Sequence, residues 1–158
     1  MKNILWITMA AILVFFPIAA KAAMEGGHSG HGQGEMAMDH SGHSGEMIRE
    51  VNVDGYALAY HLIDMREKIK AMKNMPEMTN THHLMIYIHS PQGRKVDDAR
   101  VGYLLQNPSG EKQKAMTMGM GGGYGADVNF SEMGKYLIKT KIIIGEKQLM
   151  DEFAYHVH

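Results

Sequence analysis

The segment HHLMIYIHSPQG, residues 82–93, decides how this chain folds. Leu84, Ile86 and Ile88 alternate with other residues, and a Ser-Pro-Gln-Gly turn closes the segment. Successive side chains of a strand point to opposite faces, so the alternation predicts a strand with one face in a hydrophobic core and His82 at the end of that face.

Short segments of the same kind follow at spacings of roughly 8–12 residues, a pattern typical of sandwich folds. Turn signals such as Asp54-Gly55 and Asn107-Pro108-Ser109-Gly110 separate them. The expected strands are residues 51–53, 56–63, 81–89, 99–106, 112–118, 126–130, 135–144 and 148–157. Only the polar stretch 64–80 has room for a helical turn or two. The pattern predicts an all-β fold over residues 48–158, an immunoglobulin-like antiparallel sandwich of about seven strands.

The composition excludes several classes of protein. The 158 residues include 16 Met and 10 His but no Cys, which rules out disulfides, zinc fingers, iron–sulfur clusters and a catalytic thiol. Sixteen basic and 17 acidic residues give a net charge of −1, so no nucleic-acid partner is expected. The sequence contains no nucleophile elbow, zinc-protease motif or phosphate loop, and we expect no enzyme activity.

Residues 1–22 resemble a secretory signal. Lys2 precedes an apolar run from Ile4 to Ile18, and Ala20-Lys21-Ala22 is a small-x-small cleavage site. The run is shorter than the roughly 20 residues that span a bilayer. We therefore expect cleavage after Ala22, a periplasmic or secreted protein, and no stable membrane insertion afterwards.

Residues 23–47 differ from the rest in composition. They contain seven Gly, four His and four Met, but no Lys, Arg, aromatic or β-branched residue. Such a tail buries too little apolar surface to fold alone, so we expect disorder. His-rich tracts are candidates for metal binding, with a plain flexible linker as the alternative. The candidate ligands are His28, His31, Met36, Met38, His40 and His43.

The expected domain holds a second group of candidates. His83 and Met85 share the outer face of the strand, next to His82, while Met116, Met118 and Met120 share one face if that segment stays extended. Core packing is the alternative for the methionines, because Met often fills irregular gaps. His61 and His89 are interpreted as surface histidines.

Soft-metal chemistry explains why Met and His are enriched together without Cys. Thioether sulfur suits Cu(I) and Ag(I), whereas imidazole also suits Cu(II), Ni and Zn. Copper, with Cu(I) favoured over Cu(II), is therefore the expected metal; Ag(I), Ni and Zn are the alternatives.

Four segments carry a family resemblance: residues 82–88, 101–104, 114–128 and 134–140. They resemble small secreted bacterial domains of the YtkA-like kind, which are similar in architecture to CopC-type periplasmic copper carriers. The resemblance implies an immunoglobulin-like sandwich. It does not carry over the Cu(II) site of CopC, because the expected mature chain begins Ala23-Met24-Glu25, without a histidine ligand.

We therefore expect a periplasmic copper-binding protein for metal storage, delivery or resistance. One alternative is a non-catalytic assembly module of a membrane efflux or oxidase complex, with the Met-rich stretch as an adaptable interface. A second alternative is a Ni or Zn buffer acting through the His-rich tail.

Overall fold

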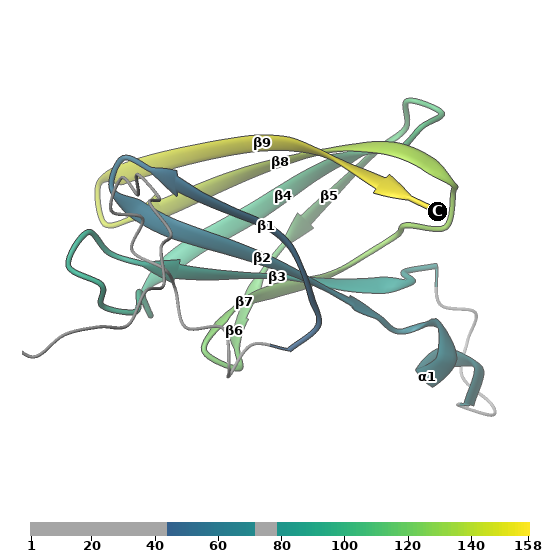
Figure 1. Cartoon of the computed structure of the whole chain (residues 1–158), viewed down its shortest axis with the longest axis horizontal. Helices are drawn as coiled ribbons and strands as arrows, with labels where there is room; N and C mark the ends of the chain where they lie inside the picture. Colours follow the sequence, from purple (N-terminus) through teal and green to yellow (C-terminus); the bar gives the residue numbers. More distant parts are fainter. Residues whose placement is uncertain (1–43, 72–78) are drawn as a thin grey trace, which may run out of the picture. The chain divides into compact units, whose positions relative to one another are not determined.

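The computed structural model describes residues 44–71 and 79–158, which form two antiparallel sheets packed face to face (Figure 1). Sheet A contains, in spatial order, β1 (Glu46–Val53), β2 (Tyr56–Asp64), β3 (His82–His89), β7 (Gly123–Val128) and β6 (Met118–Met120). Sheet B contains β5 (Lys112–Met116), β4 (Ala99–Gln106), β8 (Gly134–Ile144) and β9 (Lys147–Val157). The helix α1 (Arg66–Ala71) follows β2. The predicted all-β antiparallel sandwich is confirmed, with nine strands in the described residues.

The Asp54-Gly55 hairpin forms as predicted. Both residues have positive φ, 50° for Asp54 and 83° for Gly55, and the Gly55 amide donates to Asn52 Oδ1 over 2.9 Å. Two consecutive positive φ angles give a turn whose twist matches that of the flanking strands. The turn therefore sets the register of β1 against β2, with Val53 opposite Tyr56.

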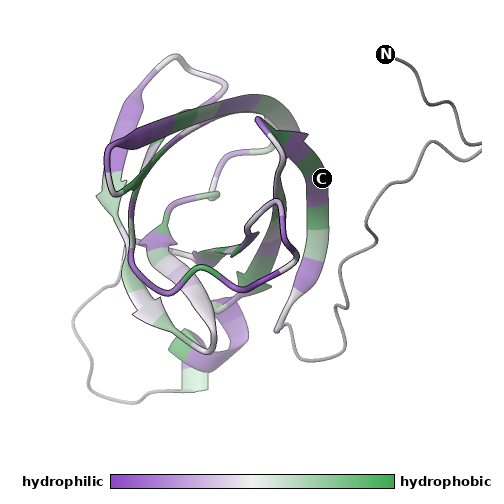
Figure 2. Cartoon of the chain, turned by 90° about the vertical axis from the view of Figure 1, so that its left-hand side faces the viewer, coloured by the Kyte–Doolittle hydropathy of each residue, from purple (hydrophilic) through white to green (hydrophobic). Residues whose placement is uncertain are grey.

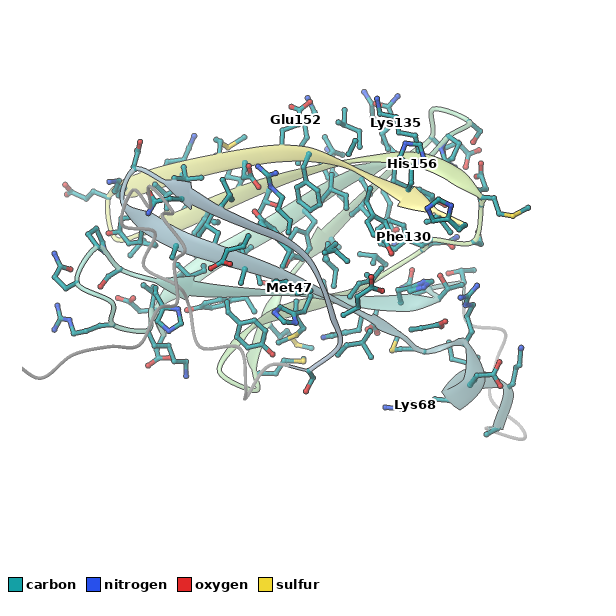
Figure 3. The ribbon with its side chains drawn as sticks, viewed as in Figure 1. Met47, Lys68, Phe130, Lys135, Glu152 and His156 are labelled. Carbon is teal, nitrogen blue, oxygen red and sulfur yellow. The ribbon has the colours of Figure 1, made fainter. Side chains whose placement is uncertain are left out.

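The core lies between the sheets and follows from strand alternation. Leu84, Ile86 and Ile88 of β3 are at most 1% exposed. They pack with the inward residues of β4 and β8 and with Phe130, which is labelled in Figure 3. Figure 2 shows hydrophilic and hydrophobic residues following one another along the strands. Burying a large apolar side chain stabilises the fold by about 1.5–3 kcal/mol, so this alternation is the main source of stability.

One charged residue interrupts the inward face of β9. Asp151 is 9% exposed, and its carboxylate accepts hydrogen bonds from Arg49 Nε and Nη2, both at 2.9 Å. The Arg49 guanidinium also lies 5.0 Å from the centre of the Phe153 ring, and the Asp151 hydrogen bond raises the pKa of Arg49. This ion pair joins the edge strand β1 of sheet A to the edge strand β9 of sheet B.

The chain changes sheets at Thr117. The backbone amide and the hydroxyl of Thr117 both donate to Val101 O, at 3.1 Å each, which ends β5 in sheet B. The next residues form β6 in sheet A. The prediction that Met116, Met118 and Met120 share one strand face is therefore wrong, because a sheet switch separates Met116 from the other two.

Some predictions fall on residues outside 44–71 and 79–158, or at the edge of these ranges. The expected signal sequence 1–22, the expected tail as far as His43, and residues 72–78 lie outside the described residues. β1 begins at Glu46, so Glu46 and Met47, which the composition groups with the tail, belong to sheet A. Within residues 44–71 and 79–158, no helix is long and apolar enough to cross a bilayer.

Candidate metal centre

The outer face of sheet A, which points away from sheet B, gathers soft ligands in register. Met85 of β3 lies opposite Gly125 of β7, and Gly125 lies opposite Met118 of β6. His83 lies opposite Asp127 in the neighbouring row. Directly opposed residues of antiparallel strands project from the same face, so these side chains share one surface.

His83 and Met85 meet above Gly125, and Met120 of β6 reaches His83; we call these three side chains the His83–Met85–Met120 cluster. His83 Nε2 lies 3.1 Å from Met120 Sδ. A β-carbon built on Gly125 would collide with both His83 Nε2 and Met85 Sδ. Because Gly125 has no side chain, His83 Nε2 and Met85 Sδ occupy the space above it, and Met120 Sδ lies beside His83 Nε2. The predicted pair His83 and Met85 is brought together with Met120 from a different strand.

Asp127 orients the imidazole of this cluster. Its Oδ1 lies 2.6 Å from His83 Nδ1. A carboxylate only accepts hydrogen bonds, so Nδ1 carries the proton and donates it. In the neutral ring, Nε2 then presents a lone pair toward Met120 Sδ. This carboxylate–imidazole arrangement is the one that commonly holds a histidine ligand in the correct tautomer.

Gly125 is required by space rather than by backbone conformation. Its φ is outside the positive region, so the backbone alone would accept another residue. The close approach of His83 and Met85 is what excludes a side chain. Gly125 therefore controls how closely His83 Nε2 and Met85 Sδ can approach one another.

His61 extends the site along β2. It lies opposite Met85 and is only 3% exposed, so its interpretation as a surface histidine is wrong. Its ring meets Tyr87 edge-to-face at 5.3 Å, and its Nδ1 lies 3.4 Å from Gly45 O. β2 is a central strand, and Gly45, just before β1, contacts this part of its outer face.

The entry to β1 crosses the same surface. The Ser44 amide donates to the Tyr87 hydroxyl over 3.3 Å. Met47, labelled in Figure 3, lies opposite His61 and is 46% exposed. One row across all five strands of sheet A therefore reads Met47, His61, Met85, Gly125, Met118.

His82 does not join the cluster. It points into the sandwich, is 5% exposed, and packs edge-to-face on Phe130 at 5.5 Å. Burial lowers the pKa of His82, and the carboxylate of Asp64, 4.0 Å from Nε2, opposes that shift. Thr81 Oγ1 lies 2.8 Å from its Nδ1. His82 and His83 are adjacent in sequence but lie on opposite faces of β3.

The remaining predicted ligands fall elsewhere. Met116 projects from the outer face of sheet B and is 75% exposed. Met118 is 69% exposed in the same row as Met85, next to the cluster. The tail candidates His28, His31, Met36, Met38, His40 and His43 lie outside the described residues.

The donor atoms that meet on this face include sulfur. The part of the chain that the structure describes contains no group of three or more His, Asp or Glu side chains arranged to hold a metal. The His83–Met85–Met120 cluster instead offers two neutral soft donors and one borderline donor, a set that suits Cu(I) or Ag(I) rather than Zn, Mg or Ca.

Sequence reasoning missed Asp127, Gly125 and His61. A signal for the first two was present, because Gly123, Gly125 and Asp127 alternate in GYGADV and so share one strand face. Two glycines precede Asp127 on that face. Glycine inside a strand often marks a place where a ligand or another part of the chain approaches the backbone closely.

No protein-family model and no curated protein matches this chain, but several solved structures do. FetP of uropathogenic Escherichia coli strain F11, expressed in the periplasm, matches with a TM-score of 0.50 and 22% identity over 70% of this chain and 94% of FetP. Copper-reconstituted P19 of Campylobacter jejuni matches with a TM-score of 0.53 and 14% identity, covering 70% of this chain and 93% of P19.

A DUF4426 family protein of Pseudomonas aeruginosa PAO1 matches with a TM-score of 0.54 and 12% identity, covering 69% of this chain and 93% of that protein. At such identities a structural match demonstrates a common fold. The predicted CopC-like architecture is thereby confirmed, whereas the YtkA-like label stays a prediction. This chain shares the β-sandwich fold of FetP and P19.

Proposed function

We propose that this chain binds copper, as Cu(I), through His83 Nε2, Met85 Sδ and Met120 Sδ, and that it serves copper storage, delivery or resistance in the periplasm. The observation that carries the proposal is that His83 Nε2 lies 3.1 Å from Met120 Sδ and shares the space above Gly125 with Met85 Sδ. His83 and Met85 come from β3 and Met120 from β6, so two strands that are not adjacent in sheet A supply the donors.

The donor set matches the chemistry of a soft monovalent ion. Two thioethers add no charge, and with Nδ1–H donating to Asp127, Nε2 is the ring nitrogen available to the metal. Asp127 supplies a negative charge behind the ring, which raises the basicity of Nε2 as a ligand. Met118 and His61, in the row through Met85, are the nearest candidates for a further ligand.

The structural neighbours support copper and the compartment. P19 was crystallised in a copper-reconstituted form, and FetP was expressed in the periplasm. Both share the fold that positions the His83–Met85–Met120 cluster. The signal-like residues 1–22 support export independently of any neighbour.

The tail has a separate proposed role. Its four histidines and its methionines would capture metal weakly, since ordering a flexible segment costs free energy. Imidazole-rich tails also accept Ni and Zn, so a Ni or Zn buffer is the competing proposal for residues 23–47. The two proposals differ in their dependence on sulfur.

Competition titration with a Cu(I) chelator tests the cluster directly. The double substitution His83→Leu/Met85→Leu removes two donors while keeping apolar volume. We expect affinity to fall by at least about 100-fold, because even an outer partner of a metal ligand typically contributes 10–100-fold. The double substitution Met150→Leu/His156→Leu is the matched control, since both residues are exposed on sheet B.

Three outcomes would contradict the proposal. The first is equal loss in both double variants. The second is retention of full Cu(I) affinity by His83→Leu/Met85→Leu. The third is tight binding of Zn or Ni that survives loss of both sulfurs. Substituting His28, His31, His40 and His43 by Gln in the same assay separates the tail from the cluster.

Two further expectations remain proposals. The protein delivers its copper to, or receives it from, a component of a membrane efflux or oxidase complex, and it acts without catalysis. Capture of one membrane partner by wild type, but not by His83→Leu/Met85→Leu, would tie such a partner to the metal.

A further inference from the structure

The outer face of sheet B, on the opposite side of the sandwich from the His83–Met85–Met120 cluster, is strongly basic. Alternation sends every second residue of β4, β5, β8 and β9 to this face. Its cations are Arg100, Lys112, Lys114, Lys135, Lys139 and Lys141. Glu152 is its single carboxylate. Figure 3 shows Lys135, Glu152 and His156 pointing outward on the β8–β9 side.

This face carries an excess of positive charge, although the chain as a whole is nearly neutral. The whole sequence has 16 basic and 17 acidic residues, so six cations against one carboxylate on one surface is a marked excess. Within the described residues, an ion pair reaches only one of the six: Lys139 Nζ lies 2.8 Å from Glu152 Oε2. The other five cations are available to an external anionic surface.

Apolar side chains are interleaved with these cations. Met116, opposite Gly102, is 75% exposed, and Met150, opposite Lys141, is 53% exposed. Both line a shallow hollow of about 290 Å³, together with Leu104 and the stems of Lys114, Lys139 and Lys141. Long basic side chains can lay their stems along apolar surface while their charged ends reach outward.

We propose that the outer face of sheet B docks on an anionic phospholipid bilayer. The charge is spread over three adjacent strands, β5, β4 and β8, about 10 Å across at ~4.8 Å per strand spacing, instead of being gathered in a pocket. Basic residues combined with exposed apolar side chains are the surface chemistry that binds acidic headgroups and the interface beneath them. A partner surface made of carboxylates alone would pair with the cations but would give Met116 and Met150 no apolar contact.

Docking on this face has a consequence for the other one. The outer faces of the two sheets point in opposite directions, so a docked chain keeps the His83–Met85–Met120 cluster turned away from lipid. The proposal is independent of copper binding, since none of its residues belongs to the cluster. Either proposal can fail without the other.

Vesicle sedimentation tests the proposal. The protein is purified from the periplasm of the expressing cell, and its amino terminus is determined by mass spectrometry so that every variant begins at the same residue. Vesicles of phosphatidylcholine alone are compared with vesicles containing about one-third phosphatidylglycerol. We expect binding to the second kind only, and release when salt is raised to about 0.5 M, where charge interactions are screened.

Charge neutralisation locates the surface. Lys114→Gln/Lys141→Gln should weaken binding about 30-fold, because each basic residue near an anionic bilayer contributes about fivefold. Lys68→Gln/Lys70→Gln on α1 is the matched control, with the same loss of charge away from sheet B (Figure 3), and should change binding less than about twofold. Circular dichroism checks that both variants keep the sandwich.

Equal binding to both kinds of vesicle would overturn the proposal, as would an equal loss in the two variants. Retention on immobilised poly-glutamate without binding to either vesicle would also overturn it and assign the face to an acidic protein.

Discussion

The two outer faces of the sandwich both carry methionine above glycine, yet only one of them assembles ligands. On sheet A, Met85 and His83 meet above Gly125. On sheet B, Met116 Sδ lies 3.1 Å from where a β-carbon of Gly102 would stand, an arrangement that looks similar. The difference lies in the neighbours, which are a histidine and a second sulfur on sheet A but lysine side chains on sheet B.

This comparison shows that methionine content alone does not locate a metal site. Met116 and Met120 are four residues apart, but the sheet switch at Thr117 sends them to opposite sides of the sandwich. Met120 then lies 3.1 Å from His83 Nε2, and Met116 stays in a basic surface. Soft-metal binding should therefore depend on one of these methionines and not on the other.

The largest expected difference comes from removing one sulfur on each face. Met120→Leu should lower Cu(I) affinity by about 100-fold or more, since it deletes a direct donor and even outer partners contribute 10–100-fold. Met116→Leu should leave the affinity unchanged. Chelator competition with Cu(I) measures both. Equal affinities in the two variants would remove the distinction between the faces.

Filling the two glycine positions gives a second comparison. Gly125→Ala places a methyl group against His83 Nε2 and Met85 Sδ, so the donors must separate. We expect a ~10–100-fold loss of Cu(I) affinity, as for other disturbances of ligand geometry, and destabilisation of about 1–3 kcal/mol from overpacking.

Gly102→Ala is the matched control for that substitution. Its methyl group meets the Sδ end of an exposed, flexible Met116 side chain, which can move aside. Urea unfolding and Cu(I) competition should show little change. A Gly102→Ala variant that loses copper as strongly as Gly125→Ala would mean that the effect is a general response of the sheets.

A smaller effect is expected from the carboxylate behind the imidazole. Asp127→Asn keeps the size of the side chain but removes its charge, and an amide can turn either its oxygen or its nitrogen toward His83 Nδ1. Cu(I) affinity should fall about tenfold, at the lower end for an outer partner. Asp54→Asn, a carboxylate 3.9 Å from Lys147 Nζ in the β1–β2 turn, is the control and should have no effect. An unchanged affinity for Asp127→Asn would show that the tautomer of His83 is set by something else.

Much of the fold follows from local sequence. The alternation of Leu84, Ile86 and Ile88 places β3 with its inner face in the core, and Asp54-Gly55 gives the first hairpin. What the local pattern lacks is the choice of sheet. The switch at Thr117 depends on hydrogen bonds to Val101, sixteen residues earlier, which no short window contains.

The candidate site was only half predictable for the same reason. His83 and Met85 share a face by alternation within one strand, so their pairing follows from sequence. Met120 and Asp127 join them only through the pairing of β3 with β7 and of β7 with β6. His61 was misassigned because nothing in its own strand shows that Tyr87 and Gly45 cover it.

The smallest expected effect isolates the basic face from the metal-binding face. Glu152→Gln removes the only carboxylate on the outer face of sheet B and frees Lys139 from its ion pair, which leaves one more net positive charge on that face. Binding to phosphatidylglycerol vesicles should strengthen about fivefold, the contribution of one charge near an anionic bilayer. The Lys139–Glu152 pair is about half exposed on each side, so its loss should cost little stability, within the 0–1 kcal/mol of surface pairs.

Cu(I) affinity should stay the same, because no atom of the cluster faces sheet B. A change in copper affinity without a change in vesicle binding would show that the two faces are coupled through the core, and the functional division between them would then be wrong.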